Sequence, residues 1–205
     1  GVYGHHEGEP IAFGVLGDSS AAGLGVEEGF ETPGALLAAG LAQMAQRPVR
    51  LTNVAKVGAQ SSDLVEQVER ILEARPVVAL IMIGANDVTH QVQPATSVRH
   101  LVQAVSTLHE HGCEVVVGTC PDLGTIEPIP HPLRWIARRW SRQLAAAQTV
   151  GVVERGGRTV SLGTLLGPEF EARPRDMFSA DRFHPSAFGY ASAAAAMLPA
   201  LAAAL

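Results

Sequence analysis

The sequence predicts a single α/β domain whose five-stranded, mostly parallel sheet is covered by helices on both faces. Short apolar runs rich in β-branched residues alternate with helical patterns along the chain, which is typical of this fold class. The 205 residues, of which 47% are hydrophobic, suit one domain with a sizeable core. No repeat, linker or change of composition marks a boundary. We therefore predict one domain over residues 11–205, preceded by a flexible tail at residues 1–10.

Five apolar runs are the predicted strands. Each is short and bounded by Gly, Pro or polar residues. They span Ile11–Leu16, Arg50–Val54, Val77–Ile83, Glu114–Thr119 and Arg158–Leu162. Ligands of open α/β sheets bind outside the carboxyl ends of the strands. We therefore expect reactive groups among the residues that follow these runs.

Helix signals fall between the runs. Pro33 is placed as a first-turn residue, Ser61 begins a cap-like sequence, and Gly112 can close a helix. The predicted helices span residues 33–46, 61–74, 94–111 and 133–154, with a terminal helix from Ser186. Two stretches, 121–132 and 163–185, are predicted to be irregular, and long loops in compact domains are often functional.

Charge and hydrophobicity argue against two classes of partner. The formal net charge of −5 argues against nucleic acid. The one basic cluster, Arg134, Arg138, Arg139 and Arg142, is predicted to be the solvated face of a helix. The apolar run Ala191–Leu205 is shorter than the roughly 20 residues that span a bilayer, so we expect a docked terminal helix and no membrane span.

The sequence leaves the localisation of the protein open but predicts the state of its two cysteines. The chain begins with Gly rather than Met, so export or attachment to the cell envelope, after removal of a signal or anchor, stays open beside a cytoplasmic location. Cys113 and Cys120 flank a predicted strand, which would hold them about 23 Å apart. A disulfide needs Cα atoms within about 7 Å of each other, so we expect two free thiols.

Ser19 is the candidate nucleophile, because Gly17-Asp18-Ser19-Ser20 forms a tight turn after the first predicted strand. Ser20 is the alternative. The glycines here do not make a phosphate loop, since no Gly-Lys-Ser/Thr follows. The nucleophile elbow of α/β-hydrolases has glycine two residues either side of the serine, and Ala21 breaks that pattern here. A serine nucleophile also needs a base, a group that orients the base, and donors for the oxyanion.

Asp181 and His184 are the candidate partners of the serine. A carboxylate three residues before a histidine can curl back to its Nδ1–H and leave Nε2 as a base. Both residues lie in the last predicted loop, which Pro185 helps to end. The alternative interpretation is a turn aspartate beside a surface histidine.

Asn86 and Gly58 are candidate donors for the oxyanion. Gly84-Ala85-Asn86-Asp87 follows the third predicted strand, so the Asn86 amide can point across the carboxyl edge of the sheet. Gly58 follows the second strand, where a glycine lets a backbone N–H approach a ligand. Both residues also fit ordinary turn chemistry, so neither is specific alone.

Together these blocks resemble the SGNH hydrolases, also called GDSL-type esterases and lipases. Gly17-Asp18-Ser19, Gly58, Gly84–Asp87 and Asp181–His184 stand in the order of the four blocks of that family. The resemblance covers nearly the whole predicted domain, and four ordered blocks make it specific. The chain also resembles an actinobacterial branch of exported or envelope-associated members.

The resemblance implies a flavodoxin-like, three-layer α/β/α fold and a role for each residue. Ser19 would be the acylated nucleophile, His184 the general base and then acid, and Asp181 the group that orients His184. The N–H groups of Ser19 and Gly58, with the Asn86 side chain, would form the oxyanion hole.

Other titratable residues near these blocks are expected to have structural roles. Asp18 is expected to stabilise the turn, because Asp181 is better placed to orient the histidine. Asp87 is expected to support the site without touching the substrate. His109 and His111 lack the spacing of metal ligands, so we expect no metal and no cofactor.

The resemblance implies a monomeric esterase that acts on a small-molecule carboxylic ester. Leu123, Ile126 and Ile129 follow the fourth strand and are expected to line a substrate pocket. Trp135 and Trp140 either extend this pocket or pack in the core or under the loop. No large lid insertion is present, which favours short acyl chains. An acyltransferase or deacetylase acting on a glycan or glycolipid, and a non-enzymatic α/β binding module, are the alternatives.

Overall fold

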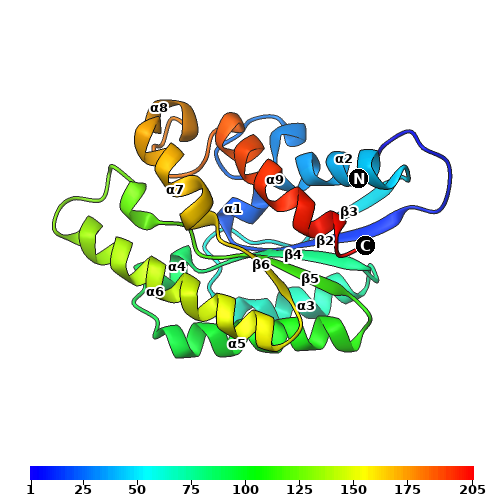
Figure 1. Ribbon diagram of the computed structural model, residues 1–205, viewed down its shortest axis with the longest axis horizontal. Coiled ribbons are helices and arrows are strands. Elements are labelled where there is room, and N and C mark those ends of the chain that lie inside the picture. The colour runs from blue at the N-terminus through cyan, green and yellow to red at the C-terminus, as the bar shows by residue number, and fades with distance from the viewer.

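The computed structural model describes residues 1–205, in which a mostly parallel β-sheet lies between two helical layers (Figure 1). The strands are β1 (Val2–Tyr3), β2 (Ile11–Gly17), β3 (Val49–Asn53), β4 (Val78–Met82), β5 (Glu114–Gly118) and β6 (Arg158–Val160). Their order is β1-β3-β2-β4-β5-β6, and every neighbouring pair except β1 and β3 is parallel. The predicted fold class is confirmed, and the carboxyl ends of β2, β4 and β5 lie side by side.

The sheet has six strands rather than the five predicted. The additional strand, β1, pairs antiparallel with β3 through Val2 and Tyr3, and the Gly1 ammonium donates to Leu51 O at 3.0 Å. An edge strand of two residues is too short to carry a periodic pattern in the sequence. Part of the predicted flexible tail is therefore tied to the sheet.

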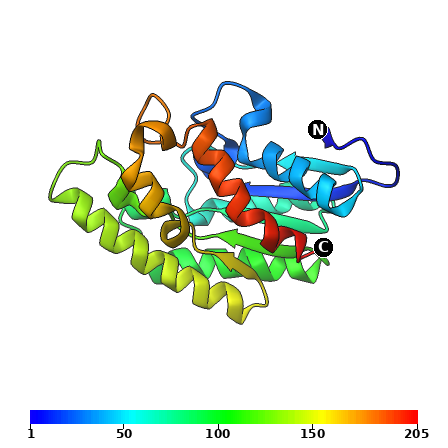
Figure 2. The same cartoon turned by 45° about the horizontal axis from the view of Figure 1, so that its top comes forward.

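Two sets of helices cover the two faces of the sheet (Figure 1, Figure 2). One layer contains α2 (Pro33–Ala45) and α9 (Ala187–Ala202), and the other contains α3 (Leu64–Leu72), α5 (Pro94–Glu110) and α6 (Leu133–Glu154). The remaining helices are α1 (Ser19–Ala22), α4 (Ala85–Thr89), α7 (Leu162–Ala172) and α8 (Pro174–Met177), with 3-10 turns η1 (Gly29–Glu31), η2 (Ser61–Asp63) and η3 (Leu123–Thr125). No helix is both long enough and apolar enough to cross a membrane.

Strand β4 shows why the sheet needs both layers. Its side chains alternate between the faces, so that Val78, Leu80 and Met82 pack with α2 and α9 while Ala79 and Ile81 pack with α3 and α5. All five side chains are buried. A strand buried on both faces has a continuous apolar sequence, which is why this run is recognisable in the sequence.

The stretch 163–185, predicted to be irregular, contains helices α7 and α8. Gly163 and Pro168 obscure α7 in the sequence, because glycine and proline are poor helix formers, yet Pro168 lies inside the helix. The glycine allows close packing, since a Cβ at Gly163 would lie 3.2 Å from Asp122 N. The other predicted loop, 121–132, contains η3 as its one regular element.

Cys113 and Cys120 are free thiols, as predicted, and both are buried. Burial raises the pKa of the Cys113 thiol to about 12, and it also raises the pKa of Cys120 well above its ordinary value. The thiolate is the reactive form of cysteine, so neither thiol is poised as a nucleophile at neutral pH.

Candidate active site

Ser19 lies at the sharp turn that joins β2 to α1. Gly17 ends the strand with φ +138°, and a Cβ there would lie 1.9 Å from Met82 O, so only glycine fits. The Asp18 side chain caps α1 by accepting from Ser20 N–H at 2.9 Å, which is the turn-stabilising role expected of it. Ser19 is 9% exposed, and its N–H donates no hydrogen bond within the protein.

The buried Gln67 of α3 holds this turn with both polar atoms of its amide. Its Oε1 accepts from Gly17 N–H at 2.7 Å, and its Nε2 donates to Gly17 O at 3.0 Å. The next residue, Asp18, donates its N–H to Met82 O at 3.0 Å. The backbone that leads into Ser19 is therefore fixed on both sides. Gln67 was not predicted as a site residue, because a single amide on a helix carries no motif.

Asp18 is a buried carboxyl that changes charge close to neutral pH. It is 3% exposed, and this burial raises the pKa of Asp18 to about 6. The hydrogen bond from Ser20 N–H lowers the pKa, the charge of Asp87 raises it further, and His184 lowers it. The carboxyl therefore takes up its proton at a higher pH than an ordinary aspartate, whose pKa is about 4.

His184 joins Ser19 to Asp181. Its Nε2 lies 3.0 Å from Ser19 Oγ, and its Nδ1 lies 2.7 Å from Asp181 Oδ2. Ser20, the alternative nucleophile, forms no hydrogen bond with this histidine. A hydroxyl bonded to an imidazole whose other nitrogen is held by a carboxylate can lose its proton as it attacks an electrophile. The structure thus brings together the predicted nucleophile, base and orienting carboxylate.

The second oxygen of Asp181 holds the loop around the histidine. Oδ1 accepts from Ser179 Oγ at 2.8 Å, Phe183 N–H at 2.8 Å and His184 N–H at 2.9 Å. Arg182 takes φ +57° within this turn. Partial burial acts to raise the pKa of Asp181, but the hydrogen bonds from His184, Phe183 and Ser179 outweigh it and hold the pKa well below its usual range. The carboxylate therefore stays ionised at neutral pH.

The segment after α1 packs behind the histidine. A Cβ at Gly25 would lie 3.0 Å from His184 Cβ and 2.6 Å from Pro185 O. Tyr190 of α9 fixes this segment by donating its hydroxyl to Leu24 O at 2.6 Å. Burial raises the pKa of Tyr190, so the hydroxyl keeps its proton and remains a donor.

The two other predicted donors meet at one turn after β3. Gly58 takes φ +81°, and its N–H donates no hydrogen bond within the protein. Asn86, in α4, donates from Nδ2 to Ala59 O at 2.9 Å. An amide nitrogen carries two hydrogens, so one N–H of Asn86 remains beside this turn.

Asp87 connects the turn around Gly58 to η2 and α5 through hydrogen bonds. It is 1% exposed, and its carboxylate accepts from Ser61 N–H and Ser61 Oγ at 3.1 Å and from Ser97 Oγ at 2.8 Å. A buried carboxylate with several donors is well satisfied. Asp87 therefore supports the segment around Gly58, as expected from the sequence.

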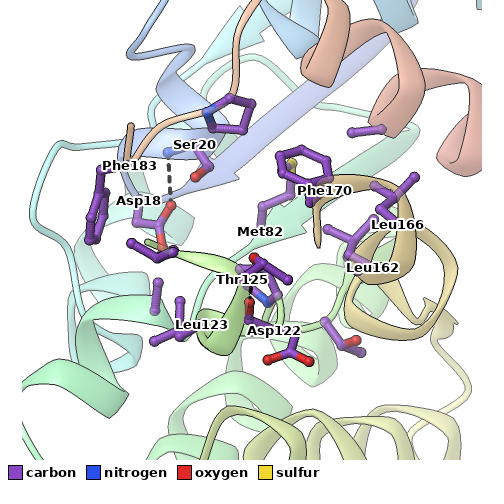
Figure 3. A pocket seen from close by; sticks show the side chains of 18 of the residues that line it. Asp18, Ser20, Met82, Asp122, Leu123, Thr125, Leu162, Leu166, Phe170 and Phe183 are labelled. Atoms are coloured by element: carbon purple, nitrogen blue, oxygen red, sulfur yellow. Dashed lines mark hydrogen bonds between the residues drawn. The ribbon is translucent and has the colours of Figure 1, made fainter. Parts of the chain in front are cut away.

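An apolar pocket of about 90 Å³ opens beside Asp18 and Ser20 (Figure 3). It lies between the ends of β4 and β5, η3, α7 and α9. Its large apolar side chains include Met82, Leu123, Leu162, Leu166, Phe170 and Phe183. Asp122 lies across this apolar pocket from Asp18 and Ser20 (Figure 3).

Two of the three residues predicted to line a pocket do so. Leu123 and Ile126 line the apolar pocket, whereas Ile129 does not and packs instead against the small core beneath the loop. Trp135 is 61% exposed and Trp140 is 39% exposed. Neither tryptophan therefore extends this pocket or lies in the buried core.

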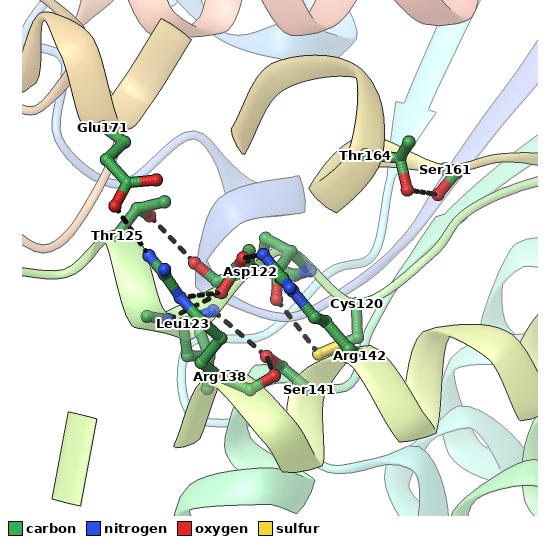
Figure 4. Close-up of polar contacts among 12 residues, drawn as sticks. Cys120, Asp122, Leu123, Thr125, Arg138, Ser141, Arg142, Ser161, Thr164 and Glu171 are labelled. Atoms are coloured by element: carbon green, nitrogen blue, oxygen red, sulfur yellow. Dashed lines mark hydrogen bonds and ion pairs between the residues drawn. The ribbon is translucent and has the colours of Figure 1, made fainter. Parts of the chain in front are cut away.

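The arginine cluster of α6 is not merely a solvated face, contrary to the prediction. Arg142 Nη2 lies 2.8 Å from Asp122 Oδ2, and Arg138 Nε lies 3.5 Å from Asp122 Oδ1 (Figure 4). Arg134 donates to Ile129 O at 2.8 Å. These long side chains reach across from α6 to the loop that forms one wall of the apolar pocket. Spacing on a helix cannot reveal a partner on another element.

Comparison with known proteins gives one family and one close relative. Residues 15–192 match the GDSL-like Lipase/Acylhydrolase family. A GDSL-like esterase from Mycobacterium tuberculosis is 47% identical over 182 residues, which make up 88% of this chain and 58% of that protein. The chain therefore spans just over half the length of this relative.

Solved structures share the fold at lower sequence identity. A lipase/acylhydrolase from Enterococcus faecalis has a TM-score of 0.76 at 19% identity, over 94% of this chain and 95% of that one. A catalytic mutant of an acetylxylan esterase from Geobacillus stearothermophilus has a TM-score of 0.75 at 21% identity, over 95% of both chains. These similarities support the three-layer arrangement alone, so the chemistry is inferred from the residues of the site.

Proposed function

Because this chain belongs to the GDSL-like lipase/acylhydrolase family, we propose that it is a carboxylic ester hydrolase with a serine nucleophile. The observation that carries the proposal is the line of contacts from Ser19 Oγ through His184 to Asp181, at 3.0 and 2.7 Å. All three residues come from one chain, so a monomer can act on a small-molecule ester.

In the proposed mechanism Ser19 Oγ attacks the ester carbonyl while its proton passes to His184 Nε2. The tetrahedral intermediate then collapses, the bond to the alcohol oxygen breaks, and His184 returns the proton to the departing alcohol. Water attacks the acyl-enzyme with His184 again as base, which releases the carboxylic acid and restores Ser19. Asp181 orients the imidazole and stabilises its protonated form without taking the proton.

The negative oxygen of the intermediate would be bound by the N–H groups of Ser19 and Gly58 and by the Asn86 amide. Both backbone donors lack partners in the protein, and Asn86 keeps one N–H beyond its bond to Ala59 O. Donors already in position need little reorganisation during the reaction. Asn86→Ala is expected to lower kcat about 10²–10³-fold, and unchanged turnover of p-nitrophenyl acetate would refute this assignment.

We infer that the acyl groups are short, because the apolar pocket beside Ser20 is only about 90 Å³. A series of p-nitrophenyl esters from C2 to C12 tests this directly. The maximum of kcat/KM is expected at C6 or below. A maximum at C12 would sink the short-chain inference while leaving the serine mechanism intact.

Covalent labelling tests the nucleophile independently of the substrate. A fluorophosphonate probe is expected to form one adduct, located at Ser19 by peptide mass. Ser19→Ala should take no label, and Ser20→Ala should still be labelled. A folded wild-type protein that takes no label would favour the non-enzymatic binding module.

A further inference from the structure

A polar cavity lies directly behind the apolar pocket. It has a volume of about 470 Å³ and is lined by residues of α6 and α7 that include Arg142, Thr164 and Glu171 (Figure 4). The two spaces have only Asp122 and Gly167 in common. These two residues therefore form the partition between a small apolar space and a larger polar one.

Asp122 is held firmly on the partition. Its Oδ2 accepts from Arg142 Nε at 3.0 Å and from Arg142 Nη2 at 2.8 Å, and its Oδ1 accepts from Gly124 N–H at 2.8 Å. Arg138 Nε lies 3.5 Å from Oδ1. The side chain of Asp122 is 4% exposed, whereas that of Arg142 is 64% exposed. The carboxylate is therefore buried and depends on its arginines for compensation.

Helix α7 closes the partition from the other side. Gly163 and Gly167 lie four residues apart and so share one face of the helix. A Cβ at Gly163 would lie 3.2 Å from Asp122 N, and one at Gly167 would lie 3.7 Å from Asp122 Cβ. The glycine face thus lets α7 approach the Asp122 backbone, which leaves little space between the two cavities.

We propose that Asp122, clamped by Arg142 and Arg138 and covered by Gly167, is the end wall of the acyl pocket and limits the length of the acyl group. This rests on the proposed function. An acyl chain carried on Ser19 would enter beside Asp18 and Ser20 and run toward Asp122, which lies across the pocket (Figure 3).

The relative sizes of two effects favour a wall over a passage. Each further methylene that an acyl chain buries improves binding by about 4-fold. Separating a buried carboxylate from its cation costs on the order of 10²–10³-fold. One or two extra methylenes therefore cannot displace the Asp122 ion pair, so chains that end before it are preferred.

The test uses one variant that should lengthen the acyl pocket and one that should shorten it. For each, kcat/KM is measured with p-nitrophenyl esters of increasing chain length. Arg142→Met keeps an aliphatic stem but releases Asp122 Oδ2, and it should raise the C10-to-C4 ratio at least 10-fold. Gly167→Leu has room at Cβ and fills the end of the pocket, so it should lower the C6-to-C2 ratio at least 10-fold.

The matched control removes an arginine from an ion pair far from the partition. Arg158 and Glu114 form such a pair at 2.6 Å near the amino ends of β5 and β6, and Arg158→Met should leave both ratios unchanged. If Arg142→Met does not fold, Asp122→Asn serves instead, because an asparagine can still accept from Gly124 N–H.

The outcomes separate the two proposals. Folded wall variants whose ratios equal those of the wild-type protein overturn the end wall while leaving the esterase intact. A wild-type protein that hydrolyses no ester and takes no fluorophosphonate overturns the proposed function itself.

Discussion

The two halves of the candidate triad are built in opposite ways. Ser19 lies in an enclosed turn, where the supporting residues Gln67 and Asp18 are 2% and 3% exposed. Asp181 and His184 lie in a surface loop, where 47% and 15% of their side chains are exposed. We call these the nucleophile turn (residues 17–20) and the base loop (residues 178–185).

The base loop is fixed mainly by contacts within itself. Phe178 and Pro185 form a β-bridge at its ends, and Ser179 N–H donates to His184 O at 2.8 Å. The nucleophile turn instead depends on Gln67, 50 residues away in the sequence. A site that is held by buried residues of other elements loses its support when the domain is destabilised. A loop that is held by hydrogen bonds within itself does not depend on the core in this way. Variants in the two regions should therefore differ in how stability and activity change together.

The largest loss of kcat is expected from Ser19 and His184, through which the nucleophile turn and the base loop contact each other. Ser19→Ala and His184→Ala should each lower kcat at least about 10⁴-fold, and the double variant should be only slightly slower, because these residues act as one unit. Turnover of p-nitrophenyl acetate measures this, with thermal melting as the control for folding. A double variant far slower than either single one would show that the two residues act on different steps.

Within the base loop, Asp181→Asn is expected to lower kcat about 10²–10⁴-fold with a small but measurable loss of stability at pH 7, because the carboxylate is half exposed. Its Oδ1 can still accept from Ser179, Phe183 and His184, but its NH₂ group faces His184 Nδ1 and favours the wrong tautomer. The lowered pKa of Asp181 means that the ionised wild-type group stabilises the native state above about pH 4. That stabilisation is lost as the pH falls below this value.

Melting curves at pH 7 and pH 3, with kcat at pH 7, check the Asp181 prediction. Wild type and variant should melt at more similar temperatures in acid. A large loss of thermal stability at pH 7 would mean that this loop is coupled to the core after all, and wild-type turnover would remove Asp181 from the mechanism.

Gln67 and Ser179 support the nucleophile turn and the base loop, and a matched pair of variants tests these two supports. Gln67→Leu leaves the buried Gly17 N–H without an acceptor, so it should cost about 1–3 kcal/mol in free energy of unfolding. It should also lower kcat about 10-fold by loosening the turn before Ser19. Ser179→Ala removes one exposed hydrogen bond to Asp181, so it should cost under about 0.5 kcal/mol.

Denaturant unfolding and kcat are measured on both support variants to test whether stability and activity fall together. Ser179→Ala should slow turnover only a few-fold, so activity and stability fall together in the nucleophile turn and separately in the base loop. Equal losses of stability in the two variants would show that the nucleophile turn and the base loop are supported in the same way.

The last prediction concerns stability alone. The pKa of Asp18 is about 6 in the native state and about 4 in an unfolded chain. Between these values the native state holds a proton that the unfolded state has released, so stability falls as the pH rises through this window. Asp18→Asn keeps an acceptor for Ser20 N–H, and it should be more stable than wild type at pH 7 by up to about 3 kcal/mol.

Chemical denaturation at pH 4 and pH 7 measures the Asp18 effect. The difference between wild type and variant should be small at pH 4 and grow toward pH 7. A variant that is no more stable than wild type at pH 7 would show that ionised Asp18 is compensated by its surroundings.

Features whose signals are local could be predicted from the sequence. Strand β4 is a continuous apolar run, and α5 lies between Pro94 and Gly112, so both were predicted almost to the residue. Ser19 begins α1, Asn86 lies in the first turn of α4, and His184 lies in the loop that leads into α9, and such positions are where open α/β sheets bring reactive groups together. The fold and the approximate site follow from such boundaries.

Features that depend on distant partners could not be identified in the same way. Gln67 and Arg142 look like ordinary helix residues, because the groups they bind are 50 and 20 residues away. Strand β1 is too short for periodicity, and Pro168 argues against the helix that contains it. Asp122, which lines the apolar pocket, is held by Arg142, so this contact could not be predicted from the sequence either.

The hydrogen bond from Gly17 N–H to Gln67 also sets how fast one amide takes up deuterium. A backbone hydrogen exchanges with solvent when its hydrogen bond opens, and this one is bonded at 2.7 Å to a buried side chain. Gly17 should therefore exchange only through global unfolding, whereas Phe183 and His184, bonded to the exposed Asp181, should exchange through local opening. Deuterium uptake at Gly17 would then measure the stability of the whole domain at a position two residues from Ser19.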